Sequence, residues 1–239
     1  MSSLNRSTML GKEKKNIHLK EPLFWAISGS ITFCILFTGI LYGCIFSFSC
    51  ASYFPTISYL ATFRSHDRWI VFGITFYSTL IPLLFISVKT KLSAYLTWLT
   101  NLIGLAGCFL IIITGVVDEV NGLYFMPLDK AHPFLTLFGY FSFAYWIHSV
   151  LKAFESIQLE FSERFWLLKC KKTVMAIHVL FVVTGFQWHF AYTIYSNFLV
   201  NEVVEALCEW SLITLALSLP YQISRITNTS ISLTWLARK

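Results

Sequence analysis

Six long apolar segments are the feature that most constrains how this chain can fold. They cover residues 23–46, 69–88, 94–117, 133–151, 173–196 and 202–221, and none contains an interior Lys, Arg or Asp. Each segment is about 20 residues long, which lets an α-helix cross a hydrocarbon core of ~30 Å. Continuous apolar runs of this length do not alternate as the strands of a β-barrel do. The pattern therefore predicts an all-α membrane protein with a six-helix transmembrane bundle.

Composition supports the same class. Hydrophobic residues make up 56% of the 239 residues and charged residues only 13%. Soluble domains contain about 25% charged residues. We therefore predict one integral membrane domain over residues 23–221, with no nucleic-acid partner.

The basic residues predict the orientation of the bundle. Most of the 18 Lys and Arg residues lie near the N-terminus, in the connections between segments two and three and between segments four and five, and in the C-terminal tail. Only Arg64, Arg68 and Lys130 belong to the other side. By the positive-inside rule, both termini are expected in the cytosol, as a basic segment over residues 1–22 and a tail over residues 222–239.

Two further patterns concern helix packing and the cytosolic connections. Gly104, Gly107 and Gly115 in the third segment predict a close approach to another helix. Apolar residues recur every three or four positions between residues 151 and 168, which predicts an amphipathic helix on the membrane or an extension of the fourth helix. Cys170 lies between two lysines at the membrane edge, where S-palmitoylation and an unmodified thiol both remain open.

The six cysteines show no metal-binding spacing, and we predict neither a metal site nor a cofactor. Cys50 lies on the predicted lumenal side with only Cys44 nearby in the sequence. We do not expect a structural disulfide.

A stripe of carboxylates marks the sixth segment. At 100° per residue, Glu202, Glu205 and Glu209 fall within an arc of about 60° on a helix. An ionisable group inside a membrane helix is costly unless it faces protein or water, so it is a candidate functional residue. His132 opens the fourth segment and His189 lies near the end of the fifth, on the same predicted lumenal side.

Short motifs on this side resemble a known family. They are Cys50, the Ser-Tyr-Phe-Pro-Thr-Ile-Ser run at residues 52–58, Arg68-Trp69, His132, and the run from Glu205 to Trp210. Together they resemble the Frag/DRAM/Sfk membrane proteins, and most of all the branch that remodels glycosylphosphatidylinositol (GPI) anchors. The resemblance implies a six-helix protein of the Golgi or endoplasmic reticulum membrane that acts on lyso-GPI-anchored proteins. Other branches are non-enzymatic regulators of autophagy at lysosomes or of phosphoinositide signalling at the plasma membrane.

Two classes of function follow for the lumenal residues. In the first, His132 or His189 is a general base for acyl transfer, Glu205 or Glu209 orients it, and Ser58, Arg64, Arg68 and Glu202 contact the lipid headgroup. In the second, the same residues form a non-catalytic hydrogen-bond network that shapes a lipid site. No HExxH or GxSxG spacing favours the first, and no internal repeat supports a transporter. Expected partners are membrane lipids, GPI-anchored proteins and a protein of the remodelling machinery.

Overall fold

The computed structural model describes residues 14–46, 67–116, 128–194, 198–227 and 230–236. Within these ranges the chain forms six helices and two short strands. In chain order they are β1 (Lys14–Lys20), α1 (Glu21–Phe46), α3 (Asp67–Leu92), α4 (Trp98–Val116), α5 (Leu128–Glu155), α6 (Phe161–Ile194), α7 (Phe198–Thr227) and β2 (Ser230–Leu236). Each apolar segment thus coincides with one helix, which confirms the prediction of a helical fold.

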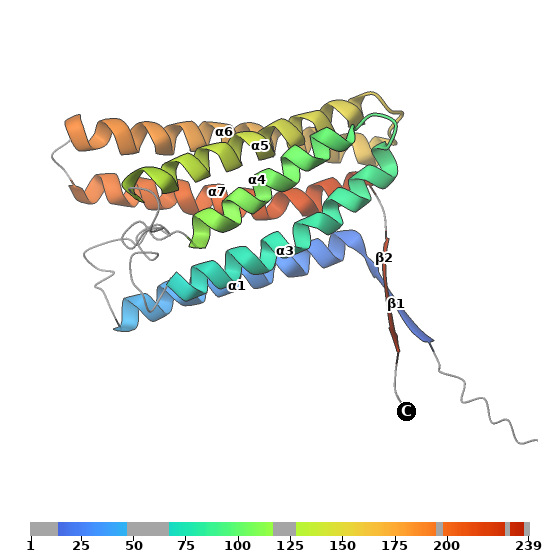
Figure 1. The fold of residues 1–239 in the computed structure, drawn as a ribbon, viewed down its shortest axis with the longest axis horizontal. Helices are drawn as coiled ribbons and strands as arrows, with labels where there is room; N and C mark the ends of the chain where they lie inside the picture. The colour runs from blue at the N-terminus through green and yellow to red at the C-terminus, as the bar shows by residue number, and fades with distance from the viewer. Residues whose placement is uncertain (1–13, 47–66, 117–127, 195–197, 228–229, 237–239) are drawn as a thin grey trace, which may run out of the picture.

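Successive helices run in opposite directions along the bundle (Figure 1). Both strands lie beside the end where α1 begins and α7 ends, which we call the terminal end. The strands pair antiparallel, with Lys14 opposite Leu236 and Lys20 opposite Ser230. This pairing joins the N-terminal segment to the C-terminal tail and was not predicted from the sequence, because it depends on two segments that are far apart in the chain.

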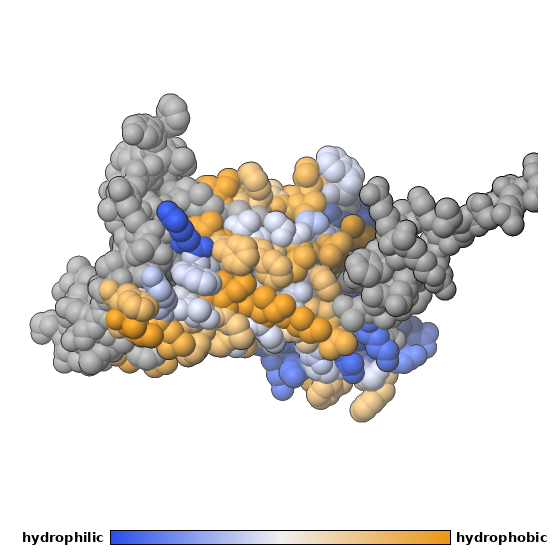
Figure 2. All heavy atoms as spheres, turned by 90° about the horizontal axis from the view of Figure 1, so that it is seen from below, coloured by the Kyte–Doolittle hydropathy of each residue, from blue (hydrophilic) through white to orange (hydrophobic). Residues whose placement is uncertain are grey.

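Three helices in the described part of the chain are long and apolar enough to cross a membrane: Glu21–Phe46, Val71–Leu92 and Phe134–Glu155. Large apolar side chains on the outside of the bundle are exposed, among them Phe72, Phe109 and Phe141. Such side chains cover the middle of the face in Figure 2, and hydrophilic ones gather toward the terminal end. An exposed apolar surface of this extent fits a protein that is surrounded by lipid.

Glycines bring α4 and α5 into close contact. A Cβ atom on Gly107 would lie 2.8 Å from the Phe143 backbone nitrogen and 3.0 Å from the Gly139 carbonyl oxygen. A Cβ atom on Gly104 would lie 2.5 Å from the Trp146 side chain. The predicted role of Gly104 and Gly107 in helix approach is confirmed. Gly115 lies in α4, beyond the residues whose side-chain surroundings the structure describes.

The connection between α5 and α6 corrects one prediction. A single amphipathic helix over residues 151–168 is wrong, because α5 ends at Glu155 and α6 begins at Phe161. Glu163 starts the new helix by accepting a hydrogen bond from the Glu160 backbone N–H at 3.1 Å, as in a capping box. The predicted apolar stripe is divided accordingly, with Phe154 fully buried and Phe161 90% exposed.

Candidate functional site

The helices bring most of the predicted site residues to one end of the bundle. Arg68 lies at the start of α3 and His132 at the start of α5, while His189 lies near the end of α6. Glu202 and Glu205 lie in the first turns of α7. All five belong to the end opposite the termini (Figure 1). Arg68 is exposed, and the side chains of the other four lie outside the described part, as do Ser58 and Arg64 entirely.

Glu209 is the member of the carboxylate stripe whose side chain the structure describes. It is half-buried in α7, and the neighbouring Trp210 packs edge-on against Phe33 of α1 with ring centroids 5.8 Å apart. Trp210 also packs against the buried residues Leu36 and Ile40 of α1. Trp210 therefore fixes this turn of α7 against α1, and Glu209 lies about 100° around the helix from that contact, which was not evident from the sequence.

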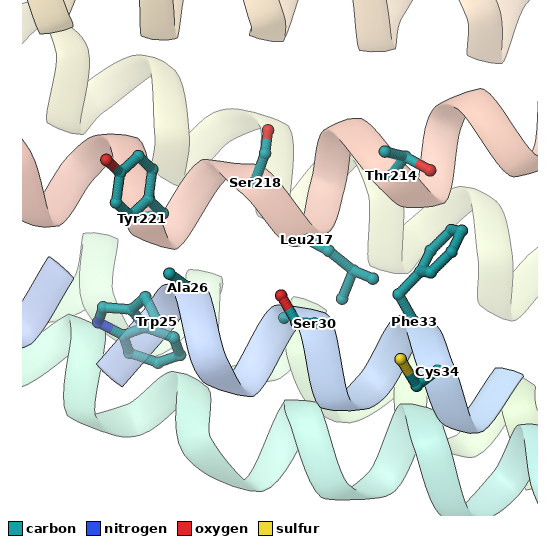
Figure 3. Close-up of a pocket in the computed structure, with 10 residues that line it drawn as sticks. Trp25, Ala26, Ser30, Phe33, Cys34, Thr214, Leu217, Ser218 and Tyr221 are labelled. Atoms are coloured by element: carbon teal, nitrogen blue, oxygen red, sulfur yellow. The ribbon is translucent and has the colours of Figure 1, made fainter. Parts of the chain in front are cut away.

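A groove of about 480 Å³ opens between α1 and α7, beginning just beyond this contact. Trp25, Ser30 and Phe33 of α1 and Thr214 and Tyr221 of α7 are among the residues that line it (Figure 3). The two helices approach closely at its floor, where a Cβ atom on Gly29 would lie 3.3 Å from the Leu217 carbonyl oxygen. The groove therefore runs along the bundle between two aromatic residues at one end and Phe33 at the other.

The hydroxyl groups of Thr214 and Ser218 on the α7 side of the groove are engaged within the protein. Thr214 donates to the Trp210 carbonyl at 2.8 Å, and Ser218 donates to the Leu215 carbonyl at 2.7 Å. Ser218 also accepts a hydrogen bond from Gln222 at 2.9 Å. Because these groups already have partners, the groove presents a mainly apolar wall. Such a wall suits a hydrocarbon chain better than a polar substrate.

The terminal end carries a second polar cluster, which ties four helices together. Lys91 of α3 donates to Glu163 of α6 at 2.6 Å and to the Ile226 carbonyl of α7 at 2.5 Å. Glu21 of α1 is fully buried and accepts hydrogen bonds from Trp25 at 3.2 Å and from Thr227 at 3.4 Å. The positive charge of a lysine that caps a helix C-terminus interacts favourably with the negative end of the helix dipole. We interpret this cluster as a structural clamp.

A third polar group joins α5 to α6 and was missed by the sequence analysis. The Tyr140 hydroxyl is hydrogen-bonded to His178 Nδ1, and His178 Nε2 lies 2.7 Å from His148 Nε2. Of the three histidines inside the apolar segments, only His189 was considered from the sequence. The signal that could have found this group is the presence of two histidines inside those segments, since any ionisable residue there is a candidate.

The structure bears on two of the cysteines. Cys44, near the end of α1, is disulfide-bonded, so the prediction of no disulfide is wrong. Cys170 is fully buried, and burial raises the pKa of its thiol to about 12. A buried neutral thiol is a poor nucleophile, so the structure supports the unmodified form over S-palmitoylation. Disulfides form and persist mainly in oxidising compartments.

Among the residues with described side chains, no group of three or more His, Cys, Asp or Glu residues is placed to hold a metal ion. Comparison with protein families, curated proteins and solved structures found no match.

Proposed function

We propose that this chain is a six-span membrane protein that binds the acyl chain of a lyso-GPI lipid during remodelling of GPI anchors. It resembles the Frag/DRAM/Sfk branch typified by post-GPI-attachment-to-proteins factor 2. In this proposal the protein resides in the Golgi or endoplasmic reticulum membrane with both termini in the cytosol. The disulfide at Cys44 supports a lumenal placement of the opposite end, because that end then faces an oxidising compartment.

The groove between α1 and α7 is the observation that carries the binding step. Its mainly apolar lining suits an acyl chain. Thr214 lines the groove five residues after Glu209, which is about 7.5 Å along a helix. At 100° per residue, Glu209 lies about 140° around the helix from Thr214, so the groove and the carboxylate stripe are close in depth but on different faces of α7. In this proposal the polar head lies at this end of the groove, at the depth of the stripe, and the tail extends toward Trp25 and Tyr221.

The residues at the head of the groove have two possible uses within this proposal. In the catalytic version, His132 or His189 takes the proton of the free lyso-lipid hydroxyl as that hydroxyl attacks the carbonyl carbon of an ester or thioester acyl donor, and Glu205 or Glu209 orients the imidazole. The protonated imidazole then gives its proton to the alcohol or thiol that leaves the donor. In the accessory version, the same groups bind the hydroxyl and present the lipid to a partner enzyme. Ser58, Arg64, Arg68 and Glu202 are assigned to the phosphate and glycan headgroup in both versions.

Rescue of cells that lack the GPI-remodelling factor tests the proposal. The readout is the ratio of GPI-anchored protein on the cell surface to that shed into the medium. Wild-type protein should restore the surface fraction, and Ser30→Trp should not, because Ser30 lines the groove. Ile31→Trp is the matched control, since Ile31 is exposed on the same helix and does not line the groove.

Substitutions at the head of the groove separate the two versions. Glu209→Gln should abolish rescue in both. In the catalytic version, replacing the histidine that acts as the base (His132→Ala or His189→Ala) should abolish rescue with lyso-lipid binding retained. In the accessory version the same replacement should weaken lyso-lipid binding itself. Failure of the correctly localised wild type to rescue would refute the GPI role. It would favour the alternative role, that of a non-enzymatic regulator at the lysosome or the plasma membrane.

A further inference from the structure

The seam between α5 and α6 contains polar pairs at two depths. Glu155 and Lys171 form an ion pair at the terminal end. His148 lies seven residues before Glu155, and His178 lies seven residues after Lys171, so the histidine pair is about 10 Å deeper along the seam. Tyr140 continues the series toward the middle of the bundle. We call these five residues the α5–α6 seam.

Tyr140, His178 and His148 form a chain of two hydrogen bonds within this seam. Counting the donors and acceptors shows that His148 Nδ1 is left without a partner in this chain. If the Tyr140 hydroxyl donates to His178 Nδ1, then His178 donates through Nε2 to His148, and the Nδ1–H of His148 is left over. If the chain runs the other way, the Tyr140 O–H and a bare His148 Nδ1 are left over. Neither direction gives His148 Nδ1 a partner among the described residues. Because His148 is exposed at the outer surface of α5, that nitrogen is available to a ligand.

Positive charge next to His148 specifies the kind of ligand. Lys152 follows one helical turn later on the same face of α5, and both side chains are exposed. On α6, Lys172 is also exposed at this end. An anion placed between these two side chains would accept one hydrogen bond from Lys152 and one from the His148 Nδ1–H, and it would therefore select the first direction of the chain. Hydrogen bonds from charged donors to phosphate are among the strongest in proteins.

The surroundings of the seam favour a lipid as the source of that anion. Tyr145 and Phe141 on α5 and Met175 and Val179 on α6 are all more than half exposed. These side chains offer an apolar surface to acyl chains just below the cationic groups. Clusters of basic residues between membrane helices on the cytoplasmic side are typical binding sites for anionic headgroups.

We infer that the α5–α6 seam binds an anionic phospholipid, with its phosphate held by His148 and Lys152 and its acyl chains lying along the exposed faces of α5 and α6. This site is distinct from the groove between α1 and α7, which is lined by other helices. It also lies toward the terminal end, whereas the predicted GPI-remodelling residues lie at the opposite end. Lipid binding at the seam can therefore be measured independently of GPI remodelling.

Lipid titration of the full-length protein in detergent micelles tests this inference. Native mass spectrometry measures the binding of phosphatidylserine, with phosphatidylcholine and inorganic phosphate as comparison ligands. Phosphatidylserine should bind at least tenfold more tightly than phosphatidylcholine, and inorganic phosphate alone should neither bind nor compete at the same concentration.

Variants then assign the site. His148→Leu should weaken phosphatidylserine binding about tenfold, because a charge-assisted hydrogen bond is lost. Lys152→Gln should weaken it about fivefold, which corresponds to the loss of one lysine near an anionic headgroup. Lys89→Gln is the matched control, since Lys89 is exposed in the last turn of α3 at the same end of the bundle.

Each of three results would overturn the inference. They are equal affinity for the two phospholipids, equal effects of Lys152→Gln and Lys89→Gln, and full competition by inorganic phosphate. Lys152 is exposed, so its replacement leaves the fold intact and keeps the test valid even if His148→Leu unfolds the protein.

Discussion

Helix α5 meets α4 and α6 in opposite ways. Toward α4, glycine faces glycine, since Gly139 of α5 lies against Gly107 of α4 and its added Cβ would be 3.3 Å from the Gly107 carbonyl oxygen. Toward α6, the contact is made by the imidazoles of His148 and His178 and by an ion pair. The backbones of α4 and α5 are close over much of their length, whereas those of α5 and α6 are close at few positions.

One helix can thus combine a contact that provides stability with a contact that leaves polar groups open to a ligand. Helices in lipid associate through close van der Waals packing, which small residues permit, and through hydrogen bonds between helices. The α4–α5 contact uses both, because Trp146 is fully buried and donates a 3.1 Å hydrogen bond to Asn101. The α5–α6 seam lacks the close approach, so its polar groups remain accessible to a ligand.

The largest expected effect comes from breaking the glycine contact. Gly107→Leu should lower the free energy of unfolding in micelles by about 3 kcal/mol, because the new side chain overlaps the backbone of α5. Gly185→Leu is the control, since no atom lies within 4 Å of a Cβ atom there. Equal losses at the two glycines would show that α4–α5 packing is not the basis of stability.

A smaller effect is expected from the buried hydrogen bond in the same contact. Trp146→Phe should cost about 2 kcal/mol of unfolding free energy, because it removes packing and leaves the Asn101 carbonyl oxygen without its donor. The double variant Trp146→Phe/Asn101→Leu should recover part of this loss, since both polar partners are then absent. Strictly additive losses in the double-variant cycle would contradict the assigned coupling.

The smallest effect is expected at the outer end of the α5–α6 seam. Glu155→Gln should change the free energy of unfolding by less than about 0.5 kcal/mol, because both partners of the Glu155–Lys171 pair are substantially exposed. The same thermal or chemical unfolding series measures it. A loss as large as that of Trp146→Phe would mean that the seam is a structural contact equivalent to α4–α5, and the comparison between the two would fail.

Much of the fold was predictable because local patterns specify it. Apolar segments of sufficient length gave all six helices, and the spacing of Gly104 and Gly107 predicted the close approach to a neighbouring helix. The carboxylate stripe gave Glu209 as a candidate, but not its position beside Trp210 and α1. The groove and the His148–His178 pair were not predictable, because each depends on which helix faces which.

The sequence by itself determined that this is a helical protein of the membrane class and which residues are costly to place in lipid, since length, hydropathy and charge act locally. Tertiary structure decided the rest. It placed α7 beside α1 to form the groove, set His148 against His178, paired β1 with β2, and buried Cys170. These outcomes depend on contacts between residues far apart in the chain, and helices of similar apolarity offer no pattern that ranks one partner above another.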